Sequence, residues 1–303
     1  VSPQQAEFLR DEEHRHLGYG GARGGGKSWG LRAKAIKMCL KYKGYRYLIM
    51  RRTYPELLEN HIKPLLEILQ GIAKYNDGRK EFKFCNGSII KLGYCDSDRA
   101  VLRYQGQEWD SIGFDEATQL KEEWIVRIRA TNRGTNDYPR QCVYTMNPGG
   151  VSHGFFKRLF HDKVYRQGEK PEEYHFIAAR VTDNKALLDQ DPAYLESLMA
   201  LPPKLREAWL YGSWDILEGQ FFSMWRNDPE GYKTRKWTHV IPAEGFRLPK
   251  GWPIYRSFDW GSARPFSCGW WTVDYDGMLY RIAERYGCKK DGGDSVAHGG
   301  VKW

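Results

Sequence analysis

Residues 21–28, GARGGGKS, have the types and spacing of a loop that binds phosphate groups. They fit the pattern G-x-x-x-x-G-K-S, in which glycines let backbone N–H groups converge on phosphate oxygens because no Cβ atom blocks the approach. Lys27 would neutralise the β- and γ-phosphates of a nucleotide, and Ser28 would bind Mg²⁺. A helix directly after the loop would point its positive end at the same anion. The expected phosphate contacts are Gly21, Gly24, Gly25, Gly26, Lys27 and Ser28.

Two adjacent acids, Asp115 and Glu116, end the short segment SIGFDE. Asp115 suits the water shell of Mg²⁺, and Glu116 suits positioning and polarising an attacking water. The alternative is an exposed acidic strand end or a helix cap. Asn147, in YTMNP, ends the next expected strand, where a short polar side chain can sense a γ-phosphate. Its alternative is an ordinary Asn-Pro turn.

Strands and helices alternate through the first part of the chain, and this pattern places the loop and the acids. Helical spacing covers 31–43 and 56–70, and short β-rich runs cover 45–50, 109–117 and 141–148. Asn86-Gly87 lies between two alternating segments, which is a strong hairpin signal. The alternation predicts a parallel α/β sheet, and in such a sheet the carboxyl ends of the strands face the ligand.

The rest of the chain changes character twice. Residues 183–215 favour two short helices broken by Pro202-Pro203, and 255–261, 268–277 and 278–287 favour three successive strands. We therefore expect an ATPase domain over 1–182, a helical linker subdomain over 183–215 and a third region over 216–303.

Charge and composition limit the partners and the compartment. The formal net charge of the 303-residue chain is +9, which favours contact with a polyanion, although a merely basic surface is the alternative. The six cysteines are scattered without a CxxC pair, as expected for buried thiols in a reducing compartment. No apolar run approaches a membrane span, so we expect no membrane contact and a cytoplasmic protein.

The sequence resembles the large subunit of tailed-bacteriophage terminases from Pro3 to about Glu284. The likeness rests on YQGQEWDSIGFDEATQ (104–119), together with GGARGGGKS before it and TMNP after it. The segment DPAYLESLMALPPKLREAWLYGSWD (191–215) is similar to that family's connector. The resemblance implies a DNA-packaging ATPase with a RecA-like (ASCE) P-loop domain, a helical linker and an RNase H-like α/β nuclease domain.

The resemblance also implies roles for single residues. Gln5 matches a glutamine that reads the adenine of ATP. Arg23 matches a basic residue of the phosphate loop that couples or stabilises the transferred phosphate, and a guanidinium there can follow developing γ-phosphate charge. The alternative for Arg23 is a surface arginine paired with an acid. TMNP, with Asn147, aligns with a motif that passes hydrolysis to DNA movement.

In the same resemblance, Asp259 is the first carboxylate of a nuclease that holds Mg²⁺ or Mn²⁺. Two-metal cleavage needs several carboxylates. Asp274 and Asp276 are better explained as turn residues, and Glu284 is a weak candidate. We therefore expect the nuclease domain to be incomplete in this chain, which makes nuclease activity doubtful.

The implied partners are double-stranded DNA, the portal protein, the small terminase subunit and further copies of the chain in a pentameric ring. The implied location is the host cytoplasm, with a transient stay on the viral procapsid. Two alternatives stay open: a helicase-like DNA-remodelling ATPase, and a fragment that binds nucleotide or DNA without turnover.

Overall fold

The computed structural model describes residues 1–215, 228–234, 238–242, 247–259 and 266–287. The chain forms two compact units, Val1–Gln220 and Phe221–Trp303, and each is described by itself. Across the described ranges, no helix combines the length and the apolar character needed to cross a membrane.

The first unit is built on an eight-stranded sheet in the order β3-β4-β5-β2-β6-β7-β1-β8. From β5 to β8 all neighbouring strands are parallel, whereas β3-β4 and β4-β5 are antiparallel. The strands are β1 His16–Gly21, β2 Arg46–Arg51, β3 Ala73–Asn76, β4 Glu81–Phe84, β5 Ile89–Tyr94, β6 Ser111–Phe114, β7 Gln141–Met146 and β8 Tyr174–Ala179. The predicted parallel α/β sheet and the hairpin at Asn86-Gly87 are therefore confirmed.

Strand β1 is fully buried although its sequence, HLGYGG, is glycine-rich. Its glycines follow from crowding: a Cβ at Gly18 would lie 2.8 Å from the Phe176 ring, and one at Gly20 would lie 2.1 Å from the Met146 carbonyl oxygen. The neighbouring strands thus supply the bulk that β1 lacks.

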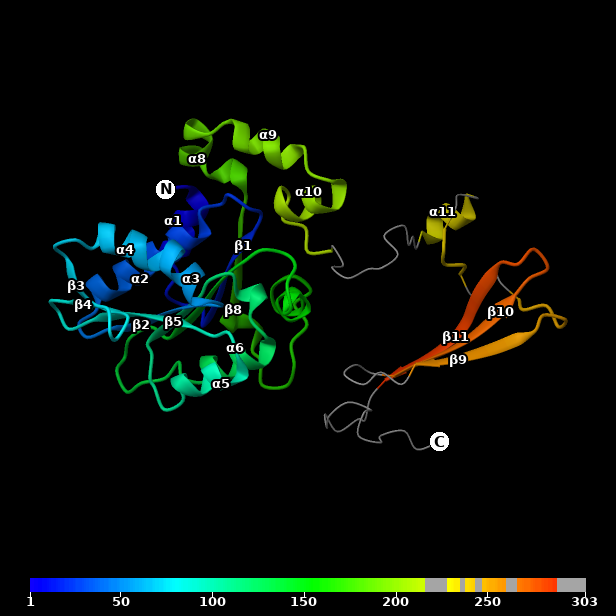
Figure 1. Cartoon of the computed structure of the whole chain (residues 1–303), viewed down its shortest axis with the longest axis horizontal. Coiled ribbons are helices and arrows are strands. Elements are labelled where there is room, and N and C mark those ends of the chain that lie inside the picture. The colour runs from blue at the N-terminus through cyan, green and yellow to red at the C-terminus, as the bar shows by residue number, and fades with distance from the viewer. Residues whose placement is uncertain (216–227, 235–237, 243–246, 260–265, 288–303) are drawn as a thin grey trace. The chain divides into compact units, whose positions relative to one another are not determined.

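Helices cover both faces of the sheet (Figure 1). One face carries α1 Pro3–Arg10, α2 Lys27–Lys41, α3 Tyr54–Leu57, the π-helical η1 Leu58–Ile62 and α4 Lys63–Ile68. The other carries α5 Asp98–Val101, η2 Leu102–Tyr104, η3 Ala117–Gln119, α6 Glu122–Arg129, α7 His153–Phe156 and the π-helical η4 Lys157–His161. The predicted helix over 56–70 is thus broken into α3, η1 and α4.

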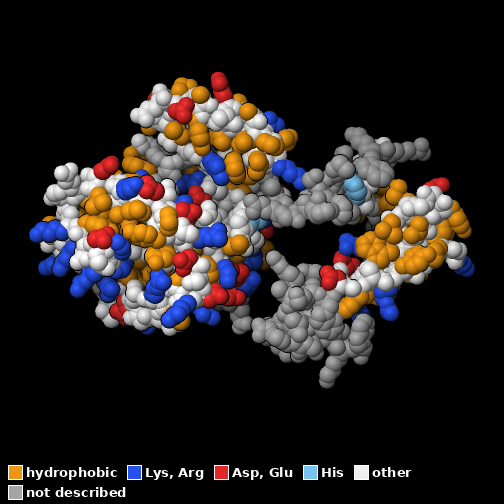
Figure 2. Space-filling model, viewed as in Figure 1, with side chains coloured by type: hydrophobic (Ala, Val, Ile, Leu, Met, Phe, Trp, Pro, Cys, Tyr) orange, Lys and Arg blue, Asp and Glu red, His pale blue; other side chains and the backbone are white. Residues whose placement is uncertain are grey.

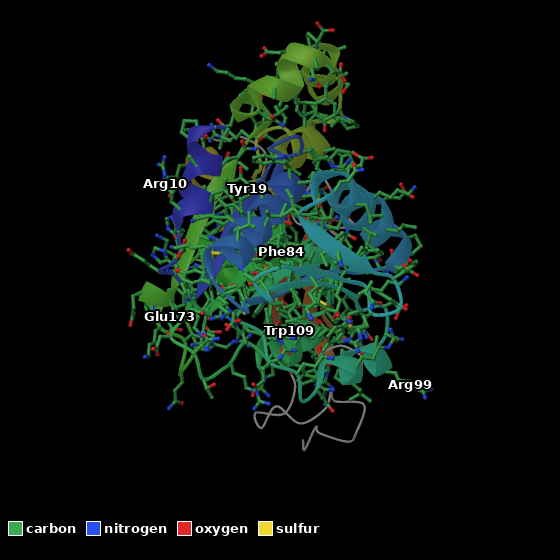
Figure 3. All side chains as sticks on the ribbon, turned by 90° about the vertical axis from the view of Figure 1, so that its left-hand side faces the viewer. Arg10, Tyr19, Phe84, Arg99, Trp109 and Glu173 are labelled. Carbon is green, nitrogen blue, oxygen red and sulfur yellow. The ribbon has the colours of Figure 1, made fainter. Side chains whose placement is uncertain are left out.

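Two hydrophobic cores follow from the alternation of side chains along the strands. On β2, Leu48 and Met50 pack into one core, and Tyr47 and Ile49 into the other. Figure 3 shows Tyr19 on one side of the sheet and Trp109 on the other, in agreement with their separate cores. Because both faces of the parallel strands are covered, the ends of these strands are where a ligand can reach the sheet.

A small helical cluster follows the sheet and belongs to the same unit. After η5 Pro171–Glu173 and η6 Val181–Asp183, it contains α8 Lys185–Gln190, α9 Ala193–Met199 and α10 Pro203–Trp209. Its own core is centred on Val181, Leu198 and Leu210. The predicted break at Pro202-Pro203 is confirmed, with Pro203 at the first position of α10, but the segment holds three helices rather than two.

The second unit contains α11 Pro229–Lys233 and a three-stranded antiparallel sheet in the order β11-β10-β9. Its strands are β9 Ile254–Asp259, β10 Phe266–Val273 and β11 Leu279–Gly287, which confirms the three predicted strands. Asp274 accepts backbone hydrogen bonds from Asp276 and Met278 in the β10–β11 turn, as expected of a turn residue. Residues 216–227 and 260–265, which the expected nuclease region includes, lie outside the described residues.

Candidate nucleotide site

A polar cleft of about 450 Å³ lies where β1 passes into α2 and where β2, β6 and β7 end. The residues around it come from five separate segments of the chain. They are Arg23, Gly24, Gly25, Gly26, Lys27, Ser28, Trp29, Arg51, Glu116, Gln119, Asn147 and Tyr194. Most of the residues predicted from the sequence thus lie around one cavity.

The loop between β1 and α2 has the backbone that a phosphate-binding loop requires. Gly24 and Gly26 have φ values of +74° and +70°, a region that side chains other than glycine rarely adopt. Helix α2 begins at Lys27, directly after Gly26, so its first N–H groups have no partner within the helix. A phosphate placed there would meet those N–H groups and the positive end of the helix dipole.

Lys27 is buried at the base of the loop, where its Nζ donates to the carbonyl oxygen of Ala22 at 2.5 Å. Burial lowers the pKa of Lys27, and the nearby Glu116 and Asp115 act in the opposite direction. The ammonium group is thus placed to exchange a loop carbonyl for a phosphate oxygen.

Asp115 lies beneath the cleft, in contact with the lining residue Ser28, and is fully buried. The Ser28 hydroxyl donates to Oδ1 at 3.0 Å and reaches Oδ2 at 3.1 Å. The Thr145 hydroxyl donates to Oδ1, while Arg51 and His61 contact Oδ2. Burial alone would raise the pKa of Asp115, but His61, Arg51 and Thr145 outweigh it and hold this pKa well below its ordinary value. Asp115 is therefore an anion with a fixed orientation.

Glu116 has an unusual backbone conformation, with φ at +51° and ψ at +49°. Its N–H donates to the Thr145 hydroxyl at 3.1 Å, and the Asn147 side-chain amide donates to Oε1 and Oε2 at 3.0 and 2.9 Å. For a residue with a Cβ, the left-handed region costs about 1–2 kcal/mol. Strain of this kind gathers at functional sites. Thr145 of β7 and Asn147, the residue directly after β7, thus hold the strained Glu116 at the cleft.

The residues present fit Mg²⁺ bound together with a nucleotide. Ser28 and Asp115 offer adjacent oxygen donors, which Mg²⁺ prefers. Among the described residues, no group of three or more His, Cys, Asp or Glu side chains could hold a metal by itself. This arrangement suits a cation that takes most of its ligands from phosphate and water.

Arg23 lies within the loop, and Gln5 lies beside it. The Arg23 guanidinium stacks on the Trp209 ring, 3.3 Å from its centroid, and its backbone N–H donates to the Trp209 carbonyl at 2.7 Å. Among the described residues, Arg23 does not form the alternative contact, an ion pair with an acid. Gln5 is buried in α1, and a Cβ placed on Gly26 would lie 2.5 Å from its Nε2.

Asp259 lies in the second unit, at the exposed end of β9. In the described part of the chain it belongs to no cluster of three metal-binding side chains. Its assignment to a nuclease metal site stays a prediction.

Thr145 and His61 are among the contributors to the site that the sequence analysis missed. Thr145 lies two residues before Asn147, and since residues i and i+2 share a face of a strand, the alternation could have identified it. His61 had no such signal, because it reaches Asp115 only through the π-helical course of η1.

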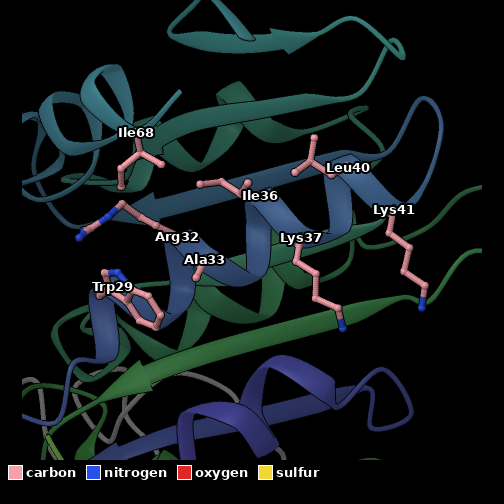
Figure 4. A pocket seen from close by; sticks show the side chains of 8 residues that line it. All are labelled: Trp29, Arg32, Ala33, Ile36, Lys37, Leu40, Lys41 and Ile68. Atoms are coloured by element: carbon pink, nitrogen blue, oxygen red, sulfur yellow. The ribbon is translucent and has the colours of Figure 1, made fainter. Parts of the chain in front are cut away.

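A larger hollow of about 620 Å³ runs along the outer side of α2 (Figure 4). Trp29, Ile36, Leu40 and Ile68 make it mainly apolar, and two of its three basic residues, Lys37 and Lys41, already pair with Glu12 at 2.7 Å. The hollow is lined by no acid and no glycine loop. The cleft is therefore the better nucleotide site, although it is the smaller of the two cavities.

Comparisons with known proteins agree with this geometry. The family model of the terminase large subunit, T4likevirus-type, N-terminal, matches residues 19–226. No curated protein matches the sequence.

Among solved structures, the large terminase of a thermophilic bacteriophage in complex with ADP is similar, with a TM-score of 0.60 and 19% identity over 100% of this chain and 71% of that one. The same terminase in complex with ATP-gamma-S has a TM-score of 0.58. The large terminase ATPase domain of Thermus phage P74-26 has a TM-score of 0.51 and 15% identity, over 71% of this chain and 94% of that one. The fold is therefore that of terminase ATPase domains, and since the family model spans most of the sequence, the chain belongs to the terminase large subunit family.

Proposed function

We propose that the chain is the ATP-hydrolysing subunit of a motor that moves double-stranded viral DNA into a procapsid. The observation that carries the proposal is that Glu116 lines one cleft with the loop of residues 21–28, while Asp115 contacts Ser28 of that loop. The complexes of a related large terminase with ADP and ATP-gamma-S support ATP as the ligand.

In this proposal, the N–H groups of Gly24 to Gly26 and the Lys27 ammonium bind the β- and γ-phosphates. Ser28 and Asp115 hold Mg²⁺, which neutralises charge that develops on the phosphate oxygens. Arg23 stabilises the transferred phosphate after leaving Trp209, and Gln5 contacts adenine. The domain boundaries at 182 and 215 belong to the same proposal.

Glu116 is the proposed general base. Its carboxylate faces the cleft and accepts hydrogen bonds only from the neutral Asn147 among the described residues. It therefore keeps acceptor capacity for a water hydrogen. Asn147 fixes the direction of that carboxylate and so limits where an attacking water can bind.

DNA is the proposed track, and the surface of the first unit supports it. Figure 2 shows Lys and Arg side chains gathered over the end of the sheet formed by β3 and β4. Lys74 and Lys83 are exposed and lie directly opposite each other across these two strands. Like charges in that position destabilise a sheet unless an anion lies between them. We define the basic edge as Lys74, Arg79, Lys80 and Lys83.

Family membership supports the portal protein, the small terminase subunit and a pentameric ring as further proposed partners, in the host cytoplasm and transiently on the procapsid. Cleavage of concatemeric DNA through Asp259 is a separate proposal, supported by sequence resemblance.

The test is the DNA-stimulated ATPase activity of Glu116→Gln. Removing the general base while keeping the side chain's size should lower kcat by about 100-fold or more, with ATP affinity retained. Turnover close to that of the wild type would remove Glu116 as the base. ATP binding without hydrolysis by the wild type, with DNA present, would instead favour the fragment that binds without turnover.

A further inference from the structure

His61 is a buried histidine that contacts Asp115 beneath the cleft. Its side chain has no exposed surface, and its Nε2 lies 2.9 Å from Asp115 Oδ2. His61 does not line the cleft, whereas Arg51, which contacts the same oxygen, does. His61 therefore approaches Asp115 from outside the cleft.

The sequence around His61 explains why its side chain can reach Asp115. Pro64, early in α4, lacks the N–H that would bond the carbonyl of Asn60 in an α-helix. Arg32 of α2 donates to that carbonyl instead, and the N–H of Lys63 bonds Leu58 five residues back. The resulting wide turn is η1, a rare conformation that is frequent at functional sites. It places His61 against Asp115.

Burying His61 leaves one of its ring nitrogens unpaired within the described part of the chain, which lowers the stability of the fold. His61 Nδ1 is buried and has no hydrogen-bond partner among the described residues. An unpaired buried polar atom destabilises a fold, and an apolar side chain would avoid the penalty. What a histidine offers here that an apolar side chain does not is the Nε2–H contact with Asp115.

The bonding of Asp115 shows what that contact does. Oδ1 is fixed by Thr145 and Oδ2 by His61 and Arg51, while the Ser28 hydroxyl spans both oxygens. In the proposed function Ser28 must turn toward Mg²⁺. The contacts from Thr145, His61 and Arg51 then have to keep the carboxylate in place.

We propose that His61 is a positioning residue that orients Asp115 for Mg²⁺ bound with ATP. The inference rests on the proposed function and assigns the task to the Nε2–H donor of the ring. Outer-shell partners of metal ligands act in this way in other metal sites.

The test compares His61→Gln with His61→Asn in the full chain. A glutamine amide extends about as far as histidine Nε2, whereas an asparagine amide stops short of Asp115. His61→Leu removes the donor, and His16→Leu is the matched control, since His16 is a buried histidine of β1 that bonds Tyr144 instead. Affinity for adenylyl imidodiphosphate is measured by calorimetry with Mg²⁺ and with EDTA, beside kcat and KM for ATP.

We expect His61→Asn and His61→Leu to lose about 10-fold of the affinity gain that Mg²⁺ provides, with affinity in EDTA unchanged. His61→Gln and His16→Leu should stay close to the wild type. Equal behaviour of Gln and Asn at position 61, or an unchanged Mg²⁺ gain in both, would overturn the inference. If His61→Leu does not fold, the Gln and Asn variants decide. Because binding is read without turnover, a wild type that fails to hydrolyse ATP would refute the proposed function and leave this test intact.

Discussion

Replacing Asn147 by Ala tests whether the cleft depends on the orientation of Glu116. The substitution removes the amide that donates to both carboxylate oxygens at 3.0 and 2.9 Å. It leaves the N–H contact with Thr145 in place. The perturbation is therefore confined to the direction of one carboxylate.

The magnitude follows from the contacts. Hydrogen bonds to charged groups contribute about 1.5–3 kcal/mol. The Asn147 amide shares one donor group between both oxygens of the half-buried Glu116, so its contribution belongs at the lower end of that range. If Glu116 activates water only in its fixed direction, about 1.5 kcal/mol corresponds to a decrease in kcat of about 10-fold. KM for ATP should change little, because Asn147 acts on the acid.

The assay is steady-state ATP hydrolysis with and without duplex DNA, beside a thermal unfolding curve. Asn136→Ala is the matched control, since it removes an amide contact of 3.0 Å to Asp110, just before β6 begins. Its kcat should stay at the wild-type level. A kcat for Asn147→Ala that is unchanged or higher, in a protein that unfolds normally, would refute the reasoning.

Two further predictions concern the basic edge and a buried histidine. Lys83→Glu replaces the pair of like charges with Lys74 by a pair of opposite charges, so the free energy of unfolding should rise by a few tenths of a kcal/mol or stay constant. The affinity for DNA should fall and depend less on salt. Lys170→Glu, beyond the other edge of the sheet, is the control, and an equal loss of DNA affinity in both variants would argue against a localised site. Burial lowers the pKa of His16 to about 3, so between pH 6.5 and 3 the unfolded chain binds a proton that the folded chain does not, and stability falls as the pH falls. Between pH 7 and pH 5 the loss should be about 2 kcal/mol in urea unfolding, and a His16→Leu variant with the same pH dependence would contradict it.

The sequence was informative wherever one short segment carries both the chemistry and the fold signal. Residues 21–28 predict their own conformation, because the glycines expected to bind phosphate also permit the positive φ angles. Asp115, Glu116 and Asn147 could be placed because buried parallel strands must end at one edge of the sheet.

The rest could not be predicted because it depends on contacts between distant segments. The strand β1 has few apolar residues, since bulk from β7 and β8 replaces its own side chains. The stacking of Arg23 on Trp209 joins residues of the phosphate loop and α10, which no spacing rule connects. The reach of His61 arises from a missing N–H at Pro64, three residues further along the chain.

The hydroxyl of Thr145 touches both acids, as acceptor for the backbone of Glu116 and as donor to Asp115. The proposed metal ligand and the proposed base therefore share one anchor, so any sliding of this strand would displace the two together and preserve their spacing. A valine at this position would have the same shape but would lack the hydroxyl that links the two acids. Serine is the only other small side chain that could keep both contacts.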